Sequence, residues 1–353
     1  MTKATRFPET SPPSVYIILL NWNGWRDTIE CLESVMRLDY QLFRVVVCDN
    51  YSADGSLDHI VQWAQGIVAA EASNPALRHL TSPPIAKPIT FRRLGPSEQI
   101  DITSSSEKLI LVQTGANLGF AGGNNVGLRL ALSDATCRFV WLLNNDTVVA
   151  PDALGQLIAR MQERPEAGIC GSKLVYYRDV HKVQVLGGSI YKRWVARIGH
   201  IGAGLDATQP IEPGTVESRM QYVVGASMMI RRELLERIGL LDERYFLYFE
   251  ELDLCTRARK AYGLTYAHES IVYHKEGASI GTSTVKDRTQ SAMAQQYASR
   301  NRILFTRIHF PFALGTVLIS VLSTTLARLL AGRYGEFVQS LKGMLAGLFL
   351  DIG

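Results

Sequence analysis

Two aspartates follow apolar runs that are typical of buried β-strands. Asp49 comes directly after residues 43–48 (FRVVVC), and Asp146 comes after residues 139–143 (FVWLL) and two asparagines. Ligands of open parallel sheets bind beyond the carboxyl ends of the strands, where a carboxylate can hold a ribose, a base or a divalent cation. Either aspartate could instead cap the next helix. The pattern favours a functional role for Asp146 and leaves Asp49 open.

A second group of acids, Glu250, Glu251 and Asp253, follows the aromatic run at 245–249 (YFLYF). Acids at a helix start are also expected from the helix dipole alone. Helical spacing predicts that Glu250 and Asp253 share one face and that Glu251 points elsewhere. An acid desolvated by the aromatic residues would have a raised pKa, which suits a general base.

Residues 117–125 (NLGFAGGNN) form a glycine-dense segment before a helix predicted to start near Val126. Glycines allow backbone N–H groups to approach a phosphate or a sugar. The segment is not a G-x-G-x-x-G motif, so a dinucleotide fingerprint is not predicted. His274 follows the apolar residues 270–273; a lone histidine is more often structural, but this strand end would also suit a metal ligand.

The elements that position these residues are predicted by alternating apolar runs and helical patterns. Residues 15–20 (VYIILL) and 43–48 read as strands, with a helix after Asp27 between them. This alternation is typical of βαβ units, so we expect an α/β fold with a mostly parallel central sheet flanked by helices. Residues 66–108 are rich in Pro and Ser and are expected to be an irregular insertion.

The composition excludes several protein classes. The chain has 353 residues, a net charge of +4 and five cysteines without a Cys-x-x-Cys pair. Such a balance gives no case for nucleic acid as a partner, and the scattered cysteines favour a reducing compartment over a disulfide framework. Residues 1–13 are polar and lack the apolar core of a secretory signal. We therefore expect a flexible tail at 1–13 and a cytoplasmic protein.

The C-terminal part differs from the rest, because residues 312–327 carry no charge. Sixteen residues are fewer than the roughly 20 that a membrane-spanning helix needs. Two interpretations remain for an extension at 281–353: helices lying on the inner face of the cell membrane, or a dimer interface. Basic residues beside the apolar faces favour peripheral membrane association.

Taken together, the motifs resemble the family-2 inverting glycosyltransferases of the GT-A fold, especially their bacterial rhamnosyltransferase-like branch. The resemblance rests, in chain order, on VYIILLNWNG, VVVCDNYSADGS, NLGFAGGNN, WLLNNDT, the segment from VVGASMM to RKAYG, and VYH. It spans about residues 14–280, which we take as one catalytic domain. It implies sugar transfer from a nucleotide-sugar, dTDP- or UDP-linked, to a hydroxyl of a glycan or lipid-linked acceptor in cell-wall or O-antigen synthesis, with dTDP-L-rhamnose favoured.

The resemblance also implies site residues and a divalent metal, Mg²⁺ or Mn²⁺. Glu251 would be the general base. Asp146 and His274 would bind the metal with Asn144, which stands where the family usually has an acid and supplies no charge. Glu250, Asp253 and Arg257 would support the site. The donor would be bound by Asn21, Asn23, Asp49, Asn117, Gly119, Gly122, Gly123, Asn145, Gly225 and Ala226.

Two other functions are less consistent with the sequence. A nucleotidyltransferase that makes a nucleotide-sugar would want a basic glycine-rich loop after the first strand, and the residues there are NWNGWRD. A non-catalytic sugar-binding protein of the same fold would explain the missing metal acid, but it leaves Glu251, Asp146 and His274 without a reason to occur together.

Overall fold

The computed structural model describes residues 12–96, 98, 107–275 and 292–352. Nearly all of the expected tail at 1–13, part of the expected insertion at 66–108 and the start of the C-terminal extension lie outside the described residues.

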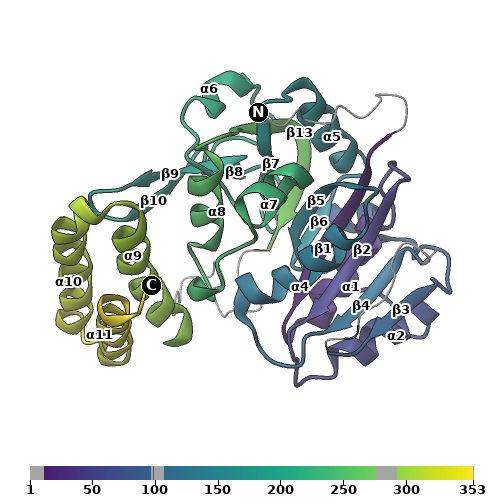
Figure 1. Cartoon of the computed structure of the whole chain (residues 1–353). Helices are drawn as coiled ribbons and strands as arrows, with labels where there is room; N and C mark the ends of the chain where they lie inside the picture. Colours follow the sequence, from purple (N-terminus) through teal and green to yellow (C-terminus); the bar gives the residue numbers. More distant parts are fainter. Residues whose placement is uncertain (1–11, 97, 99–106, 276–291, 353) are drawn as a thin grey trace.

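A mixed sheet forms the centre of the molecule, as expected for an α/β fold (Figure 1). Within the described residues it has ten strands in the order β3-β4-β2-β1-β5-β12-β7-β13-β6, with β8 beside β7. Strands β3, β4, β2, β1 and β5 run parallel, whereas β12 is antiparallel to both neighbours. The bounds are β1 Ser14–Asn21, β2 Phe43–Asp49, β3 Phe91–Leu94, β4 Leu109–Gln113, β5 Cys137–Asn144, β6 Thr147–Val149, β7 Ala167–Tyr176, β8 Val183–Leu186, β12 Ser227–Arg231 and β13 Gly263–His274.

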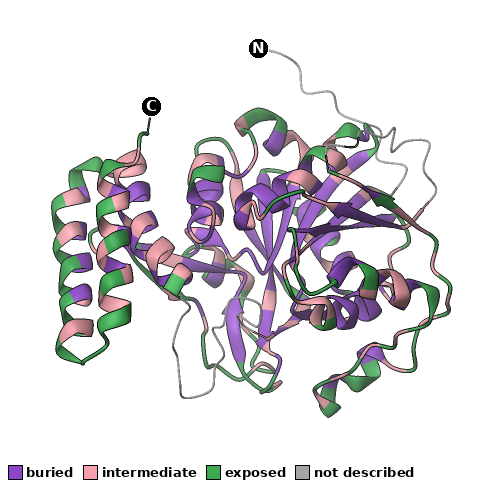
Figure 2. Ribbon diagram, turned by 90° about the horizontal axis from the view of Figure 1, so that it is seen from below, coloured by how far each residue is buried: buried purple, intermediate pink, exposed green. Residues whose placement is uncertain are grey.

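Helices cover both faces of this sheet, because its central strands are apolar on both sides. In β1, Ile17 and Leu19 pack under α1, α2 and α5, while Tyr16 and Ile18 pack under α4, α7 and α8. Figure 2 shows the strands as the buried centre between these layers. The helices are α1 Trp25–Val35, α2 Ser56–Gln65, α3 Arg78–Thr81, α4 Gly119–Ser133, α5 Ala153–Glu163, α6 Pro213–Glu217, α7 Arg232–Ile238 and α8 Glu250–Ala258.

Two local predictions were wrong. Helix α4 begins at Gly119 rather than near Val126, because its glycines are needed for close packing on β1: a Cβ on Gly123 would lie 2.4 Å from a methyl group of Leu20. The segment 66–108 is not wholly irregular, since β3 joins the sheet as an edge strand beside β4. Two short helical segments also lie there, η1 (Pro75–Leu77) and α3.

A small second sheet and a helical region extend from the central domain (Figure 1). The sheet has the order β10-β9-β11, with bounds β9 Gly188–Lys192, β10 Arg197–His200 and β11 Tyr222–Val223. The C-terminal helices are α9 Ala292–His309, α10 Leu314–Leu330 and α11 Tyr334–Phe349, with the short 3-10 helix η4 Pro311–Ala313 between α9 and α10. Another short 3-10 helix, η3 Glu243–Tyr245, precedes α8 in the central domain. Helix α11 packs closely on α9, since a Cβ on Gly343 would lie 2.2 Å from the Gln296 carbonyl oxygen.

The apolar C-terminal segment is longer than the sequence indicated. The helical stretch Pro311–Leu330 has 20 residues and a mean hydropathy of 1.7, and 28% of its most apolar window is buried. By length and composition alone, among the described residues, it is the one helix that could cross a membrane. Core helices pass the same test, so this finding assigns no location.

Candidate active site

A cavity of about 270 Å³ lies beyond the carboxyl ends of β1 and β5. This is where an open α/β sheet is expected to bind ligands. Polar groups gather on two of its walls, one at the ends of β5 and β13 and one at the start of α8. The lining residues are Leu20, Trp22, Asn50, Asn117, Gly119, Phe120, Asn144, Asn145, Asp146, Val224, Gly225, Ala226, Phe246, Leu247, Tyr248, Glu250, Glu251, His274 and Met293.

The strand-end wall holds Asn144, Asp146 and His274. The His274 Nε2 atom lies 3.2 Å from an Asp146 carboxylate oxygen and 3.3 Å from Asn144 Nδ2. The other ring nitrogen, Nδ1, lies 2.9 Å from the side-chain oxygen of Gln184, which can only accept. Gln184 thus fixes the ring so that Nε2 is directed at Asp146. Imidazole nitrogens and carboxylate oxygens are common ligands of divalent cations.

The α8 wall holds Glu250 and Glu251, each with one buried carboxyl oxygen that lacks a hydrogen-bond partner among the described residues. Burial and the neighbouring charge of Glu251 raise the pKa of Glu250 well above its ordinary value. Burial also raises the pKa of Glu251. Both effects follow from the cost of placing a negative charge away from water. Unpaired buried carboxyl oxygens beside a cavity are suited to accept hydrogen bonds from ligand hydroxyls.

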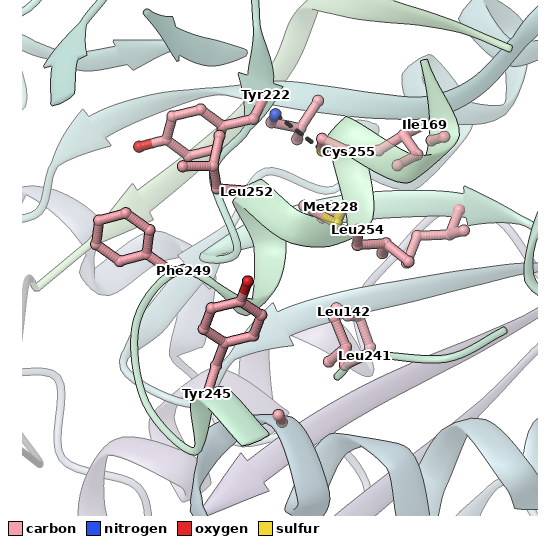
Figure 3. Close-up of a cluster of buried hydrophobic side chains, with 14 of the residues drawn as sticks. Leu142, Ile169, Tyr222, Met228, Leu241, Tyr245, Phe249, Leu252, Leu254 and Cys255 are labelled. Atoms are coloured by element: carbon pink, nitrogen blue, oxygen red, sulfur yellow. Dashed lines mark hydrogen bonds between the residues drawn. The ribbon is translucent and has the colours of Figure 1, made fainter. Parts of the chain in front are cut away.

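Hydrophobic packing fixes the direction of α8. Leu252, Leu254 and Cys255 lie in one buried cluster with Phe249 and Tyr245 from the preceding loop, as Figure 3 shows. Phe249, the residue before the helix, has a left-handed backbone with φ of 78°. This turn directs the first residues of α8 toward the cavity while the rest of the helix enters the core.

Glu250 and Asp253, which helical spacing places on one face of α8, have different surroundings in the structure. Glu250 lines the cavity together with Glu251, whereas the Asp253 carboxylate accepts hydrogen bonds from Arg257 Nε and His309 Nε2, each at 2.7 Å. Those bonds lower the pKa of Asp253 against the opposing effect of burial. Arg257 also donates to the Ile238 carbonyl. Asp253 and Arg257 thus brace α8 and lie outside the cavity lining.

A buried polar network lies at the ends of β1, β2 and β5. Asn21 Nδ2 donates to Asp49 at 2.7 Å, and the Thr28 hydroxyl donates to the Asn21 side-chain oxygen at 2.9 Å. Asn145 Nδ2 in turn donates to the Thr28 hydroxyl at 2.9 Å. Of the residues expected to bind the nucleotide-sugar here, Asn145 lines the cavity, whereas Asn21 and Asp49 do not. Asn23 is also outside it and accepts from the Ala53 N–H at 2.8 Å.

The glycine-dense segment is used mainly for packing and internal hydrogen bonds. Asn117 and Gly119 line the cavity, as do the expected Gly225 and Ala226, but Gly122 and Gly123 do not. The Gly119 N–H donates to the Asn117 side chain at 3.0 Å, and the Phe120 N–H donates to the Phe246 carbonyl at 2.6 Å. The amides at this helix start therefore already have partners within the protein.

Several cavity residues were not predicted from the sequence. Asn50 is buried and ties the glycine-dense segment to β2, because it donates to Asn117 at 2.9 Å and accepts from the Leu118 N–H at 2.9 Å. Its position directly after Asp49, at the end of a predicted strand, was the sequence feature that could have identified it. Met293 had no such signal, and neither had Gln184, which contacts His274 from outside the cavity lining.

The chain is similar to known glycosyltransferases. Residues 98–239 match the model of the family described as Glycosyl transferase family 2. Over 172 residues the chain is 27% identical to the low-salt glycan biosynthesis hexosyltransferase Agl10 of Haloferax volcanii, covering 46% of this chain and 52% of that protein. Over 193 residues it is 28% identical to the N-acetylglucosaminyl-diphospho-decaprenol L-rhamnosyltransferase of Mycobacterium tuberculosis, covering 48% and 60%. The chain thus spans a little over half the length of these relatives.

A solved structure shares the fold. The mannosyltransferase PcManGT from Pyrobaculum calidifontis, in complex with GDP-Man and Mn²⁺, aligns with a TM-score of 0.52 and 16% identity over 96% of this chain and 88% of that chain. The likeness confirms the GT-A fold expected from the sequence. The family match and the rhamnosyltransferase relative support a family-2 glycosyltransferase similar to the rhamnosyltransferase-like branch.

Proposed function

We propose that the protein transfers a sugar from a nucleotide-sugar to an acceptor hydroxyl with inversion at the anomeric carbon. The observation that carries this proposal is that two unlike groups of polar side chains line one cavity. One wall offers Asp146, His274 and Asn144, and the other offers Glu250 and Glu251. A direct displacement needs both kinds of group, because one must stabilise the leaving diphosphate while the other takes the proton of the attacking acceptor hydroxyl.

The strand-end wall fits a divalent metal in part. Asp146 supplies a carboxylate oxygen, His274 supplies Nε2 held by Gln184, and Asn144 supplies an amide. Within the part of the chain that the structure describes, no group of three or more His, Cys, Asp or Glu side chains is placed to hold a metal. We therefore propose an incomplete site that needs donor phosphate oxygens as further ligands. A metal bound there would neutralise the charge of the departing nucleoside diphosphate.

On the opposite wall, Glu251 would act as the general base. Its carboxylate would take the proton of the acceptor hydroxyl while that oxygen forms the new bond to the anomeric carbon and the bond to the diphosphate breaks. Burial raises the pKa of Glu251, which strengthens the carboxylate as a base. Glu250, whose pKa is raised further by the adjacent charge, would hold a proton and share it with the Glu251 carboxylate. Gly225 leaves room beside Glu251, since a Cβ there would lie 3.8 Å from the Glu251 Cβ.

We propose dTDP-L-rhamnose as the donor and a glycan or lipid-linked glycan of the cell surface as the acceptor. The residues that would contact the nucleotide-sugar directly are Asn117, Gly119, Asn145, Gly225 and Ala226. Support comes from the relative named a rhamnosyltransferase and from the many apolar side chains in the cavity, which suit the methyl group of a 6-deoxy sugar. Asn21, Asn23 and Asp49 would shape the nucleotide side from beneath the lining.

We also propose that the C-terminal helices associate with the cytoplasmic face of the membrane, with a homodimer as the competing outcome. Large apolar side chains of α10 are exposed, with Ile319 at 69% and Leu330 at 88% of their surface. Figure 2 shows this exposed outer face on the C-terminal helices. Sedimentation with and without liposomes of anionic lipid separates the two outcomes. A membrane-associating protein should sediment with the liposomes, whereas a homodimer should form whether or not they are present.

The experiment that tests the proposed reaction is a transfer assay with purified protein, a lipid-linked sugar acceptor and a panel of nucleotide-sugars in Mg²⁺ or Mn²⁺. We expect release of the nucleoside diphosphate with one dTDP- or UDP-sugar and a product of inverted anomeric configuration by NMR. Retention of configuration would contradict the direct displacement. Formation of a nucleotide-sugar from a sugar phosphate and a nucleoside triphosphate would support a nucleotidyltransferase instead.

A further inference from the structure

The loop at residues 243–249, which we call the pocket loop, has an uncommon backbone. Phe246, Tyr248 and Phe249 have φ values of 62°, 68° and 78°. Residues with a Cβ adopt positive φ rarely, because the Cβ then approaches backbone atoms. Such conformations persist only where surrounding groups hold them. The pocket loop therefore needs an external support.

Asn301 of α9 supplies a contact of this kind. Its side chain is fully buried, and its Nδ2 atom lies 2.8 Å from the carbonyl oxygens of Tyr245, Leu247 and Tyr248. The three oxygens share the two amide hydrogens. The opposite amide orientation is excluded, because it would place the Asn301 oxygen against these carbonyl oxygens. The Asn301 oxygen instead accepts from Arg300 Nε at 2.8 Å.

Further contacts from α9 hold the pocket loop and α8 at successive helical turns. The Tyr297 ring stacks on Phe246 with centroids 4.7 Å apart, and Arg300 donates to the Tyr245 carbonyl at 2.7 Å. One end of the helix supplies Met293 to the cavity lining, and the other end binds α8 through His309 and Asp253. Helix α9 thus runs alongside the site rather than forming a detached extension.

The pocket loop in turn borders the groups proposed to do the chemistry. Phe249 is the residue before α8, so its backbone sets the direction of the first turn, which carries Glu250 and Glu251. The Phe246 carbonyl accepts from the Phe120 N–H at the start of α4. A change in the pocket loop would therefore displace both carboxyl groups relative to the opposite wall.

We infer that Asn301 is a positioning residue for the reaction: by holding three carbonyls of the pocket loop, it places Glu250 and Glu251 against the substrate. This inference rests on the proposed function for its catalytic consequence. It makes α9 a required part of the active site, supplied from outside the segment that matches the family model.

Asn301→Asp tests the inference. It keeps the shape of the side chain but replaces the donating amide group with a carboxylate oxygen, which would face three carbonyl oxygens with no hydrogen to donate. We expect kcat to fall at least about 10-fold while KM for the donor stays within about threefold, since small misplacements of a reacting group act mainly on the chemical step. The matched control is Thr306→Val, which removes a buried hydroxyl that donates to the Arg302 carbonyl of the same helix at 2.7 Å. The control should retain wild-type kcat.

A second measurement covers the case in which Asn301→Asp does not fold. Tyr297→Ala removes the stacking on Phe246 from a less buried position, and we expect it to lower kcat in the same sense. Hydrogen exchange of the peptide at 243–251 should be faster than wild type in both variants and unchanged in Thr306→Val. Folded variants with wild-type kcat and wild-type exchange would overturn the inference. If the wild-type protein transfers no sugar, the proposed function fails, and exchange still decides whether Asn301 holds the pocket loop.

Discussion

Two sets of buried polar side chains lie within the same site and differ in how they are satisfied. At the strand ends, Asn21, Asp49, Thr28 and Asn145 form hydrogen bonds to one another. At the start of α8, Glu250 and Glu251 each keep a buried oxygen without a partner among the described residues. An unpaired buried polar group lowers the stability of the folded state, so a protein retains one only where a function or another interaction offsets that cost.

The difference separates residues that hold the site from residues that act in it. The strand-end network fixes β1, β2 and β5 relative to each other, which keeps the cavity floor rigid. The glutamate pair is left ready for hydroxyl groups that arrive with the substrates. Substitutions in the glutamate pair should therefore impair turnover, and substitutions in the strand-end network should impair stability.

Glu251→Gln should reduce kcat at least about 100-fold, because the amide cannot accept a proton and general-base catalysis is typically worth that much or more. Nucleotide binding should be nearly unchanged, since the opposite wall is intact. Calorimetric titration with the nucleoside diphosphate and a product assay measure the two quantities. Wild-type turnover in this variant would remove Glu251 from the role of base.

Asp146→Ala should weaken metal-dependent nucleotide binding by at least about 10-fold, because carboxylates are the preferred anionic ligands of Mg²⁺ and Mn²⁺. Binding measured in EDTA should be the same for the variant and the wild type. Titration of the nucleotide with and without Mn²⁺ gives both comparisons. An unchanged Mn²⁺ dependence would place the metal elsewhere.

Thr28→Val should lower the free energy of unfolding by about 1–3 kcal/mol, because it leaves Asn145 and Asn21 without their shared partner in a buried network. Valine has nearly the shape of threonine, so packing is preserved. Urea denaturation measures the change. A loss below about 0.5 kcal/mol would mean that water replaces the hydroxyl.

Glu250→Gln should change the pH dependence of stability. In the wild type the folded state binds the Glu250 proton more tightly than the unfolded state, so stability is highest below the ordinary glutamate pKa of 4.5 and falls as pH rises above it. Glutamine does not ionise, so the variant does not lose stability for this reason as the pH rises. The melting temperature of the variant relative to wild type should therefore increase from pH 4 to pH 8. Parallel curves would show that Glu250 titrates normally.

The sequence predicted the frame of the fold and most of the cavity residues. Apolar runs before Asp49 and Asp146 marked strands whose ends do meet at one edge of the sheet. Helix α4 was misplaced because glycines are poor helix formers in isolation, whereas Gly123 here allows contact with Leu20. The direction of α8 was not predictable from the sequence, because it depends on the left-handed backbone of Phe249. Asn301 could not be found, since local patterns do not reveal contacts between residues more than 50 positions apart.

If the network at the strand ends holds the site and Glu251 acts in it, Glu251→Gln and Thr28→Val should fail in opposite ways. We would measure kcat and the free energy of unfolding side by side for the two variants. We expect Glu251→Gln to lose kcat and to keep or gain stability, and Thr28→Val to lose stability and to keep kcat within about threefold. Loss of stability in Glu251→Gln together with retained turnover would contradict this expectation.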